Sequence, residues 1–472
     1  MLQFKKTQII FLASMLVALL ISSCTNETFE ENLSIDSVEQ TAGSSKLTVS
    51  SFSGHHYVGN LEYVLGDVKQ AQITNKFITT AHVDNALNGF EEMGVNGIRI
   101  AIFADGVNPN ESMFTYFYNQ AKARGFKIFA NPAQHAGGKR IANGILSDGN
   151  GGTGPSVLGK TEAKNALVAR VKAFASQYPC DWISPFNEDS APGSIWYANQ
   201  MTNIYAELYG NVNGAELIGP CTWGIPAGIS VLQQSNIANY ISIATTHNLG
   251  FNHNSWSAFI DNAGDLPVWD SEVNNFKKFS DLETRIDAAI DAGVNGLVLY
   301  NSWNTIDLNS GALTSHGQAF KDKIIQYYFI ENKESGKRIK PYDNVNQNSL
   351  LVQVPSFWNG VYSQWELVPT NSGYFQFRNR GSRKYFRPVN NNDFSDIVSK
   401  TSFSGNGWHT QWQTIDAGDD YVFIKNRGSQ KKIRSRNDND ISINSNPEAV
   451  RINQSPTSWV GDRTQWKLVP VQ

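Results

Sequence analysis

Two glutamates, Glu188 and Glu272, each end a short β-rich run and could act together on one bond. Glu188 ends residues 182–188 (WISPFNE), and Glu272 ends residues 267–272 (PVWDSE). Glycosidic cleavage passes through an oxocarbenium-like state, which needs one carboxylic acid to protonate the leaving oxygen and one carboxylate at the anomeric carbon. Two carboxyl groups about 5 Å apart do this with retention of configuration. The pair therefore predicts retaining cleavage of a sugar bond.

The elements that must position these glutamates alternate between strand and helix from residue 46 to residue 326. Eight such units predict a (β/α)8 barrel. A doubly wound open sheet is the alternative, and the lack of a glycine-rich phosphate loop after the first strand weakens it. Strands are expected at 47–52, 97–103, 127–131, 182–186, 216–219, 243–246, 267–271 and 296–300, and helices at 83–93, 111–123, 160–177, 195–209, 282–291 and 317–327.

In such a barrel the functional groups lie at the carboxyl ends of the strands. Strands 4 and 7 face each other across the mouth, which predicts that Glu188 and Glu272 meet there. The other side chains expected at strand ends are His55, His56, Arg99, Asp105, His135, Asn187, Trp223, His247 and Trp303.

The arrangement resembles the signature of glycoside hydrolase clan A, in which Asn-Glu follows strand 4 and Glu follows strand 7. Within the clan, residues 183–188 (ISPFNE) are similar to the Ile-Ser-Pro-Gln-Asn-Glu of family 30, and residues 130–132 (ANP) are similar to its strand-3 loop. The resemblance extends over roughly residues 90–305. Phe186 replaces the usual Gln, and residues 133–138 (AQHAGG) replace a Trp-rich loop, so an algal-polysaccharide relative within the clan stays open.

The resemblance implies that Glu188 is the acid/base and that Glu272 is the nucleophile. Asn187 would then bind the sugar 2-hydroxyl, Arg99 would keep Glu272 ionised, and Trp303 would form the floor under the reacting sugar. A structural ion pair for Arg99 and a core position for Trp303 are the alternatives.

Other expectations rest on the residues themselves. A second carboxylate nearby is expected to raise the pKa of Glu188. His247 either orients Glu272 or a substrate hydroxyl, or is a structural histidine. His135, with His55, His56, Lys139 and Arg140, could form a basic rim for sulfate or uronate groups, or a mixed polar surface. Trp223 could line a cleft. No Cys/His grouping has metal-ligand spacing, so neither a metal nor a cofactor is expected.

The amino terminus has the pattern of an export signal. Lys5 and Lys6 precede an apolar run at 9–21, and residues 21–24 (ISSC) resemble a bacterial lipoprotein cleavage box with Cys24 as the lipidated residue. An ordinary signal peptide or a membrane anchor is the alternative. Residues 1–24 are thus a leader and 25–45 a tether, which predicts a lipid-anchored protein at the cell surface or outer membrane. Cys180 and Cys221 are expected to be free, mostly buried thiols.

Residues 327–472 contain a threefold repeat. Segments starting at Asn332, Asn379 and Asn426 align at intervals of 47 residues, and each repeat closes on a Gln-Trp pair. This resembles a ricin-type β-trefoil, close to carbohydrate-binding module family 13. The Gln-Trp tryptophans are expected to be structural. Sugar stacking is assigned to a second recurring set, for which a core role is the alternative: Trp358, Trp408 and Trp459.

Charge separates the two domains. Residues 329–472 carry 19 Lys and Arg against 13 Asp and Glu, and the rest of the chain carries 20 against 29. A basic module on an acidic enzyme favours an anionic polymer such as a sulfated galactan, although a solvated basic face without a ligand stays open. Nucleic acid is not expected, since no known motif accompanies the charge. The hypothesis is a monomeric, endo-acting polysaccharide hydrolase; a hydrolase of a neutral β-glucan or xylan and a non-catalytic glycan-binding protein are the rivals.

Overall fold

The computed structural model describes residues 54–146, 152–248, 252–273, 279–370, 373–401, 407–436 and 450–472, without the side chains of residues 279–284. The leader, the tether and Cys24 lie outside the described residues, and what was predicted for them stays a prediction. Within the described ranges, none of the helices has both the length and the apolar character needed to cross a membrane.

Eight parallel strands close into a barrel, which confirms the predicted (β/α)8 architecture and excludes the open sheet. The strands pair in chain order, and β8 returns to pair with β1. The strands are β1 (Tyr63–Asp67), β2 (Gly97–Ile102), β3 (Lys127–Pro132), β4 (Trp182–Ile183), β5 (Glu216–Thr222), β6 (Ile243–Asn248), β7 (Val268–Val273) and β8 (Gly296–Leu299).

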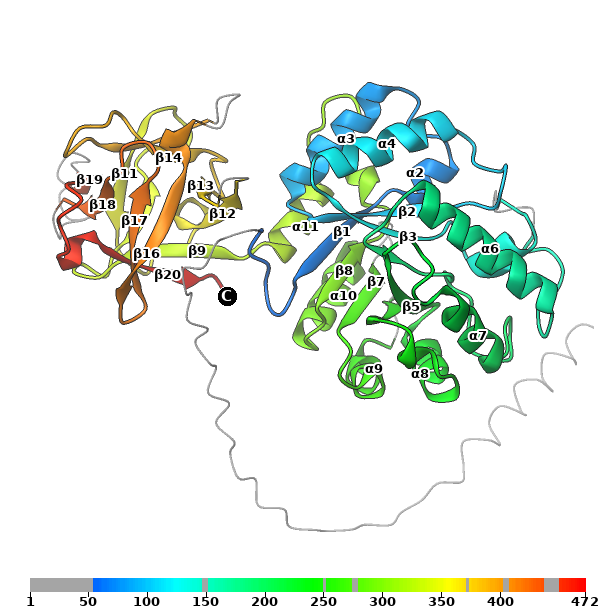
Figure 1. Cartoon of the computed structure of the whole chain (residues 1–472). Coiled ribbons are helices and arrows are strands. Elements are labelled where there is room, and N and C mark those ends of the chain that lie inside the picture. The colour runs from blue at the N-terminus through cyan, green and yellow to red at the C-terminus, as the bar shows by residue number, and fades with distance from the viewer. Residues whose placement is uncertain are drawn as a thin grey trace, which may run out of the picture. The chain divides into compact units, whose positions relative to one another are not determined.

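Helices surround these strands (Figure 1). Local signals set their ends: the side chain of Thr79 caps α3 by accepting a hydrogen bond from the backbone of His82, and Gly94 ends α3 at a φ of 85°. The helices are α2 (Lys69–Ile73), α3 (Thr80–Met93), α4 (Glu111–Ala123), α5 (Gly137–Ala142), α6 (Thr161–Gln177), α7 (Ala198–Leu208), α8 (Ile225–Gln234), α9 (Trp256–Ala263), α10 (Phe279–Asp291) and α11 (Ser315–Ile324).

The position predicted for the first strand is wrong. Residues 47–52 lie outside the described residues, and the barrel closes without them, from β1 onward. β1 was missed because Gly66 and Asp67 interrupt its apolar pattern. Gly66 is needed because a Cβ there would lie 2.4 Å from the ring of Phe90 on α3, and Asp67 is needed by Arg99 of β2.

His55 and His56 therefore do not end a barrel strand. The ring of His55 lies 3.4 Å from the place that a Cβ on Gly94 would occupy, beside the carboxyl end of α3. The carboxyl ends of the helices lie at the amino ends of the strands, so His55 is away from the mouth. His55 and His56 therefore do not belong to the basic rim that was predicted at the mouth.

Side chains from several strands fill the interior of the barrel. Trp182 and Trp269 pack edge to face with their ring centroids 4.8 Å apart, and Tyr63 packs against both. Cys180 and Cys221 are free and buried, as expected. These rings fill the barrel below the mouth, and catalytic groups in this fold lie at the carboxyl ends of the strands.

Among the residues described after the barrel, twelve strands form the second domain, four in each repeat. They confirm the predicted β-trefoil, with its repeats beginning at β9, β13 and β17. The strands are β9 (Tyr327–Asn332), β10 (Arg338–Pro341), β11 (Ser349–Val354), β12 (Trp365–Pro369), β13 (Phe375–Asn379), β14 (Tyr385–Pro388), β15 (Ile397–Lys400), β16 (Trp412–Gly418), β17 (Tyr421–Asn426), β18 (Lys432–Ser435), β19 (Ile452–Ser455) and β20 (Gln465–Pro470).

The same contacts recur in all three repeats. The tryptophan of each Gln-Trp pair is fully buried, and its Nε1 donates to a backbone carbonyl of its own repeat. The asparagine that ends the first strand of each repeat donates its side-chain amide to the backbone carbonyl of the Gln in a Gln-Trp pair. The structural role predicted for these tryptophans is confirmed, at positions Trp365, Trp412 and Trp466.

Candidate active site

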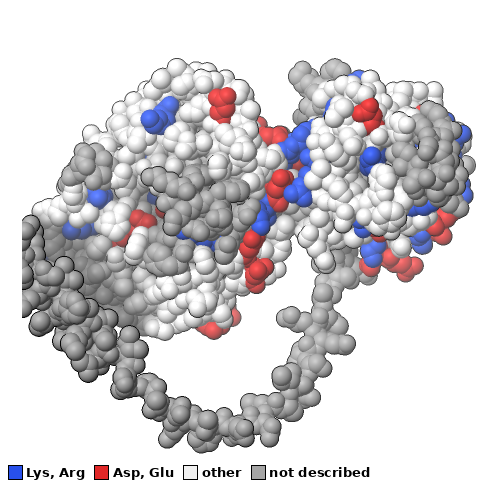
Figure 2. All heavy atoms as spheres, turned by 180° about the vertical axis from the view of Figure 1, so that it is seen from behind, with Lys and Arg blue, Asp and Glu red and all other residues white. Residues whose placement is uncertain are grey.

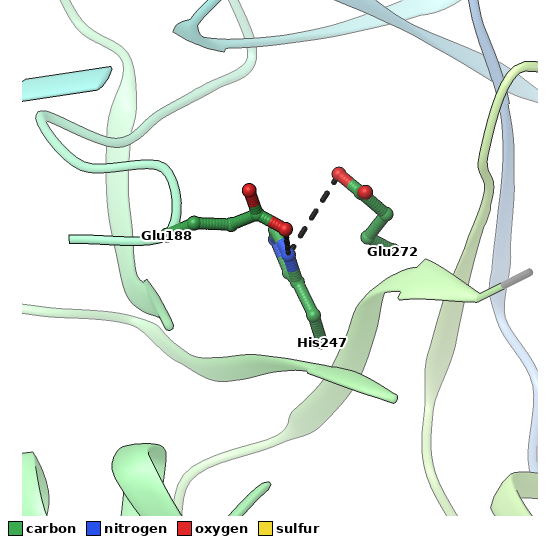
Figure 3. A group of neighbouring side chains, drawn as sticks. All are labelled: Glu188, His247 and Glu272. Atoms are coloured by element: carbon green, nitrogen blue, oxygen red, sulfur yellow. Dashed lines mark hydrogen bonds and ion pairs between the residues drawn. The ribbon is translucent and has the colours of Figure 1, made fainter. Parts of the chain in front are cut away.

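Glu188 and Glu272 meet at the mouth of the barrel. One oxygen of each carboxylate and a ring nitrogen of His247 all lie within 4.8 Å of one another. Figure 3 shows the two carboxylates approaching from different strands above the imidazole. Retaining glycosidases hold their two carboxyl groups about 5–5.5 Å apart, and inverting enzymes about 6.5–9.5 Å apart. The approach of the two carboxylate oxygens is nearer to the separation of retaining enzymes than to that of inverting enzymes.

The backbone after β4 turns sharply to present Glu188. Its φ is 56°, in the left-handed region, and its N–H donates to the carbonyl of Cys221 at 2.7 Å. The next residue, Asp189, is buried and accepts hydrogen bonds from the backbone N–H groups of Asn187, Gly138 and Lys139 and from the indole of Trp196. Asp189 thereby ties the start of α5 to the strand-4 loop, which fixes where Glu188 points.

A β-bulge brings Glu272 into the mouth. The register of β7 shifts between Asp270 and Val273 against β8, and the side chain of Asp270 accepts hydrogen bonds from the N–H groups of Glu272 and Asn248. A bulge of this kind redirects a side chain relative to the regular pleat. Burial raises the pKa of Asp270 to about 7.

Arg99 holds Glu272 from below. Its guanidinium donates to Glu272 Oε2 at 2.9 Å, to the carbonyl of Ser271 at 2.8 Å and to both oxygens of Asp67 at 3.0 Å. Arg99 and Asp67 are both fully buried. Burial alone would raise the pKa of Asp67, but the charge and hydrogen bonds of Arg99 lower it. The guanidinium lies between the carboxylates of Asp67 and Glu272 and forms an ion pair with each.

Two histidines flank Glu188. His247 Nδ1 lies 3.4 Å from Glu188 Oε1 and 3.7 Å from Glu272 Oε2, and His135 Nδ1 lies 3.4 Å from Glu188 Oε2. Burial would raise the pKa of Glu188, but hydrogen bonds from His135 and His247 and the charge of Lys69 lower it. The expectation that this pKa is raised is wrong, because the hydrogen bonds from the two histidines and the charge of Lys69 outweigh the effect of burial.

Lys69 and Asn131 orient Asn187. Lys69 is 1% exposed, and its Nζ donates to Asn187 Oδ1 at 2.7 Å and to the carbonyl of Pro132 at 3.1 Å. Asn131 Nδ2 donates to the same oxygen at 2.8 Å. With Oδ1 occupied twice, Asn187 can offer a substrate its Nδ2 group as a donor. Burial and the charge of Arg99 lower the pKa of Lys69 to about 8.

Two tryptophans expected at the mouth lie directly after barrel strands. Trp223 comes directly after β5 and is 47% exposed. Trp303 lies in a short 3-10 helix after β8 (Ser302–Thr305), is half-buried, and donates its indole N–H to Asn301. Both are therefore at the carboxyl ends of strands, where a bound chain could pass over them.

Asp67 and Lys69 were missed in the sequence. The misplacement of strand 1 hid both, since they end β1 and begin α2. The short run at 63–67 (YVLGD), which ends in an acidic residue, was the signal that could have located them.

Three of these groups could also hold a divalent cation. Glu188, His247 and Glu272 each offer one ligand atom. Arg99 and Lys69 lie against the same groups and supply positive charge already. Like charges repel, so the two buried cations disfavour a metal at this position.

Comparison with known proteins bears on the second domain. Residues 361–444 match the family described as ricin-type beta-trefoil lectin domain-like. The carboxyl-terminal domain is a ricin-type β-trefoil. A lectin domain of this type implies carbohydrate binding. No curated protein sequence matches the chain.

Solved structures resemble part of the chain. A designed threefold-symmetric protein, ThreeFoil, is 25% identical over 31% of this chain and 99% of its own, with a TM-score of 0.27. An exo-β-1,3-galactanase from Clostridium thermocellum is 25% identical over 35% of this chain and 33% of its own, with a TM-score of 0.28. An endo-β-galactosidase from Clostridium perfringens that releases GlcNAcα1-4Gal is 21% identical over 31% of this chain and 33% of its own, with a TM-score of 0.24. The chain thus spans about a third of the length of each of these two hydrolases.

The three tryptophans of the trefoil that are expected to stack on sugars differ in how far they are exposed. Trp408 is 61% exposed and Trp459 is 41% exposed, which excludes a core position for both. Trp358 is half-buried, with Lys340 Nζ 5.4 Å from its ring centroid. Trp408 and Trp459 therefore offer the larger surface to a ligand.

Proposed function

We propose that the barrel is a retaining, endo-acting glycoside hydrolase of a polysaccharide. The observation that carries this proposal is the approach of a Glu188 oxygen and a Glu272 oxygen to within 4.8 Å at the mouth of a closed parallel barrel. The ion pair from Arg99 to Glu272 supports the role of Glu272 as nucleophile, because a nucleophilic carboxylate must be ionised.

The reaction would take two steps. Glu272 attacks the anomeric carbon while Glu188 donates its proton to the glycosidic oxygen, so that the bond breaks and a covalent glycosyl-enzyme forms. Water then attacks the same carbon, Glu188 accepts the proton of that water, and Glu272 is released. Because the pKa of Glu188 is lowered in the free enzyme and its hydrogen bond raises the pKa of His135, His135 would hold the proton and return it to Glu188 when substrate excludes water.

The test combines a polysaccharide panel with product analysis. Sulfated galactans, neutral galactans, xylans and β-glucans are incubated with the enzyme, and released reducing ends and anomeric configuration are measured. Glu272→Gln should lose at least about 1000-fold in rate and keep its fold. Glu62→Gln, an exposed glutamate just before β1, is the matched control and should keep full activity. Inversion of configuration, or an active Glu272→Gln, would contradict the mechanism.

The substrate class rests on the trefoil and on charge. Its lectin fold and its surplus of Lys and Arg support an anionic glycan such as a sulfated galactan. Binding to that glycan should weaken as salt rises, and salt-insensitive binding would favour a neutral β-glucan or xylan. Binding without release of reducing ends from any member of the panel would favour a non-catalytic glycan-binding protein.

We also propose that the protein is a monomer anchored to the cell surface or outer membrane by a lipid on Cys24. The run of residues 21–24 supports the anchor. Metabolic labelling with a fatty acid should mark the wild-type protein and leave Cys24→Ser unlabelled. Light scattering on the chain without its leader tests the monomer.

A further inference from the structure

The trefoil carries side chains of both charges. On the face in Figure 2, basic and acidic side chains are interspersed among uncharged ones, so no continuous field of one sign covers it. A surplus of this kind acts through local sites rather than through a general attraction. One such site combines arginines with two exposed aromatic rings.

Phe394 and Trp459 form an exposed aromatic pair. Phe394 lies between β14 and β15, Trp459 lies between β19 and β20, and they are 49% and 41% exposed. Their ring centroids are 5.6 Å apart at an interplanar angle of 62°. Val460, beside them, is 62% exposed. Large apolar side chains gathered in water mark an interaction site more often than a chance exposure.

Arg434 of β18 lies against both rings. Its guanidinium carbon is 4.9 Å from the centroid of Trp459 and 5.1 Å from that of Phe394. Its Nε donates to Asn453 Oδ1 at 2.9 Å. That bond uses Nε, so the two terminal nitrogens are the donors that can meet a ligand. The planar fork of an arginine suits sulfate and carboxylate groups.

Further arginines surround Arg434. Burial, and then the charges of Arg463 and Arg436, lower the pKa of Arg434. Arg463 donates to the backbone carbonyl of Arg436 at 2.9 Å and pairs with Glu334 at 3.0 Å. The charges of Arg463 and Arg436 thus reach the guanidinium of Arg434, and an anion bound to Arg434 would be attracted by all three.

The loop that carries Phe394 is held in place. Phe394 has a φ of 65°, and its N–H donates to the carbonyl of Gln454 at 3.1 Å. Gln454 is fully buried, and its side-chain amide donates to the carbonyls of Asn390 and Asn392 at 2.8 and 3.0 Å. The exposed ring is therefore preorganised by β19, which lowers the entropy that a ligand must overcome.

We propose that Phe394, Arg434 and Trp459 form a binding site for an anionic sugar unit that carries a sulfate ester or a carboxylate. The C–H face of the sugar packs on the aromatic rings, and the anionic group accepts hydrogen bonds from Arg434. The proposal deepens the substrate class proposed above and rests on its carbohydrate-binding trefoil. It does not require the barrel to be a hydrolase.

The test measures binding by full-length Glu272→Gln, which excludes cleavage, to a carrageenan-type sulfated galactan, a neutral agarose-type galactan and polygalacturonate. Arg434→Gln should weaken binding to one or both anionic polymers by about tenfold, and Arg434→Lys should restore part of it. Trp459→Ala should weaken the same binding. The two anionic polymers distinguish sulfate from carboxylate.

Arg338→Gln is the matched control. Arg338 also stacks on an aromatic ring, with 3.6 Å between its guanidinium carbon and the centroid of Phe329, but that ring is buried in the first repeat. Arg338→Gln removes the same charge as Arg434→Gln and should leave binding to the anionic polymers unchanged. Equal binding to neutral and anionic galactans, equal losses in Arg338→Gln and Arg434→Gln, or an Arg434-dependent affinity for duplex DNA alone would overturn the proposal. None of these results depends on whether the barrel cleaves.

Discussion

Replacement of the buried Lys69 tests how the site holds its substrate. Its Nζ donates to Asn187 Oδ1 at 2.7 Å, and the side chain is 1% exposed. Lys69→Met keeps the length of the side chain and removes the donor and its charge. A hydrogen bond from a charged group contributes about 1.5–3 kcal/mol, so kcat/KM should fall by about 10- to 150-fold. The loss should appear mainly in kcat, since a contact to the 2-hydroxyl strengthens in the transition state.

The stability of this variant separates the effect from misfolding. The pKa of Lys69 is about 8 in the folded protein against an ordinary 10.5. The folded protein therefore bears the cost of a buried charge below about pH 8, and this cost fades as the pH rises toward 10.5. Lys69→Met removes that cost at pH 7, so the melting temperature should not fall.

A double-mutant cycle shows whether Lys69 acts through Asn187. If it does, Lys69→Met should add little to the loss already caused by Asn187→Ala. Lys122→Met is the control, because Lys122 has 40% of its side chain exposed and forms only a surface pair with Asp181, worth about 0–1 kcal/mol. Full activity of Lys69→Met, or strictly additive losses with Asn187→Ala, would refute the reasoning.

Three more outcomes follow from the structure. The hydrogen bond to Glu188 raises the pKa of His135, so the proton that the two side chains share is lost as the pH rises past this raised pKa. In His135→Gln, the fall of kcat/KM on the alkaline side of its pH profile should therefore begin at a lower pH. The stability that this pair adds is present below about pH 6.5 and is lost as the pH rises past the raised pKa of His135. The free energies of unfolding of the wild type and of His135→Gln should therefore become equal at alkaline pH. Incubation with EDTA should leave the rate unchanged, because Arg99 and Lys69 already supply positive charge to the carboxylate pair; inactivation restored by zinc or manganese would support a metal site instead. Trp412→Ala should destabilise the trefoil by about 3–5 kcal/mol in thermal unfolding while the barrel keeps its activity, and simultaneous loss of both would show that the two domains unfold together.

The sequence by itself determined the order of the elements and the residues able to do chemistry. Alternating β-rich and helical runs predicted the barrel, and the 47-residue spacing predicted the trefoil, because both patterns are local or periodic. The rule that strand ends carry the site placed Glu188 and Glu272 at the mouth. Even the misplaced first strand left this prediction intact, since strands 4 and 7 were located correctly.

Only the tertiary structure decided the contacts among those residues. Asp67 and Arg99 stand 32 residues apart and Glu272 a further 173, yet closure of the barrel brings them within 3.0 Å. The direction of the pKa shift of Glu188 was decided in the same way, because it depends on charges that surround it in space. Electrostatic energy falls with distance through space and not along the chain, so a pattern in sequence cannot supply it.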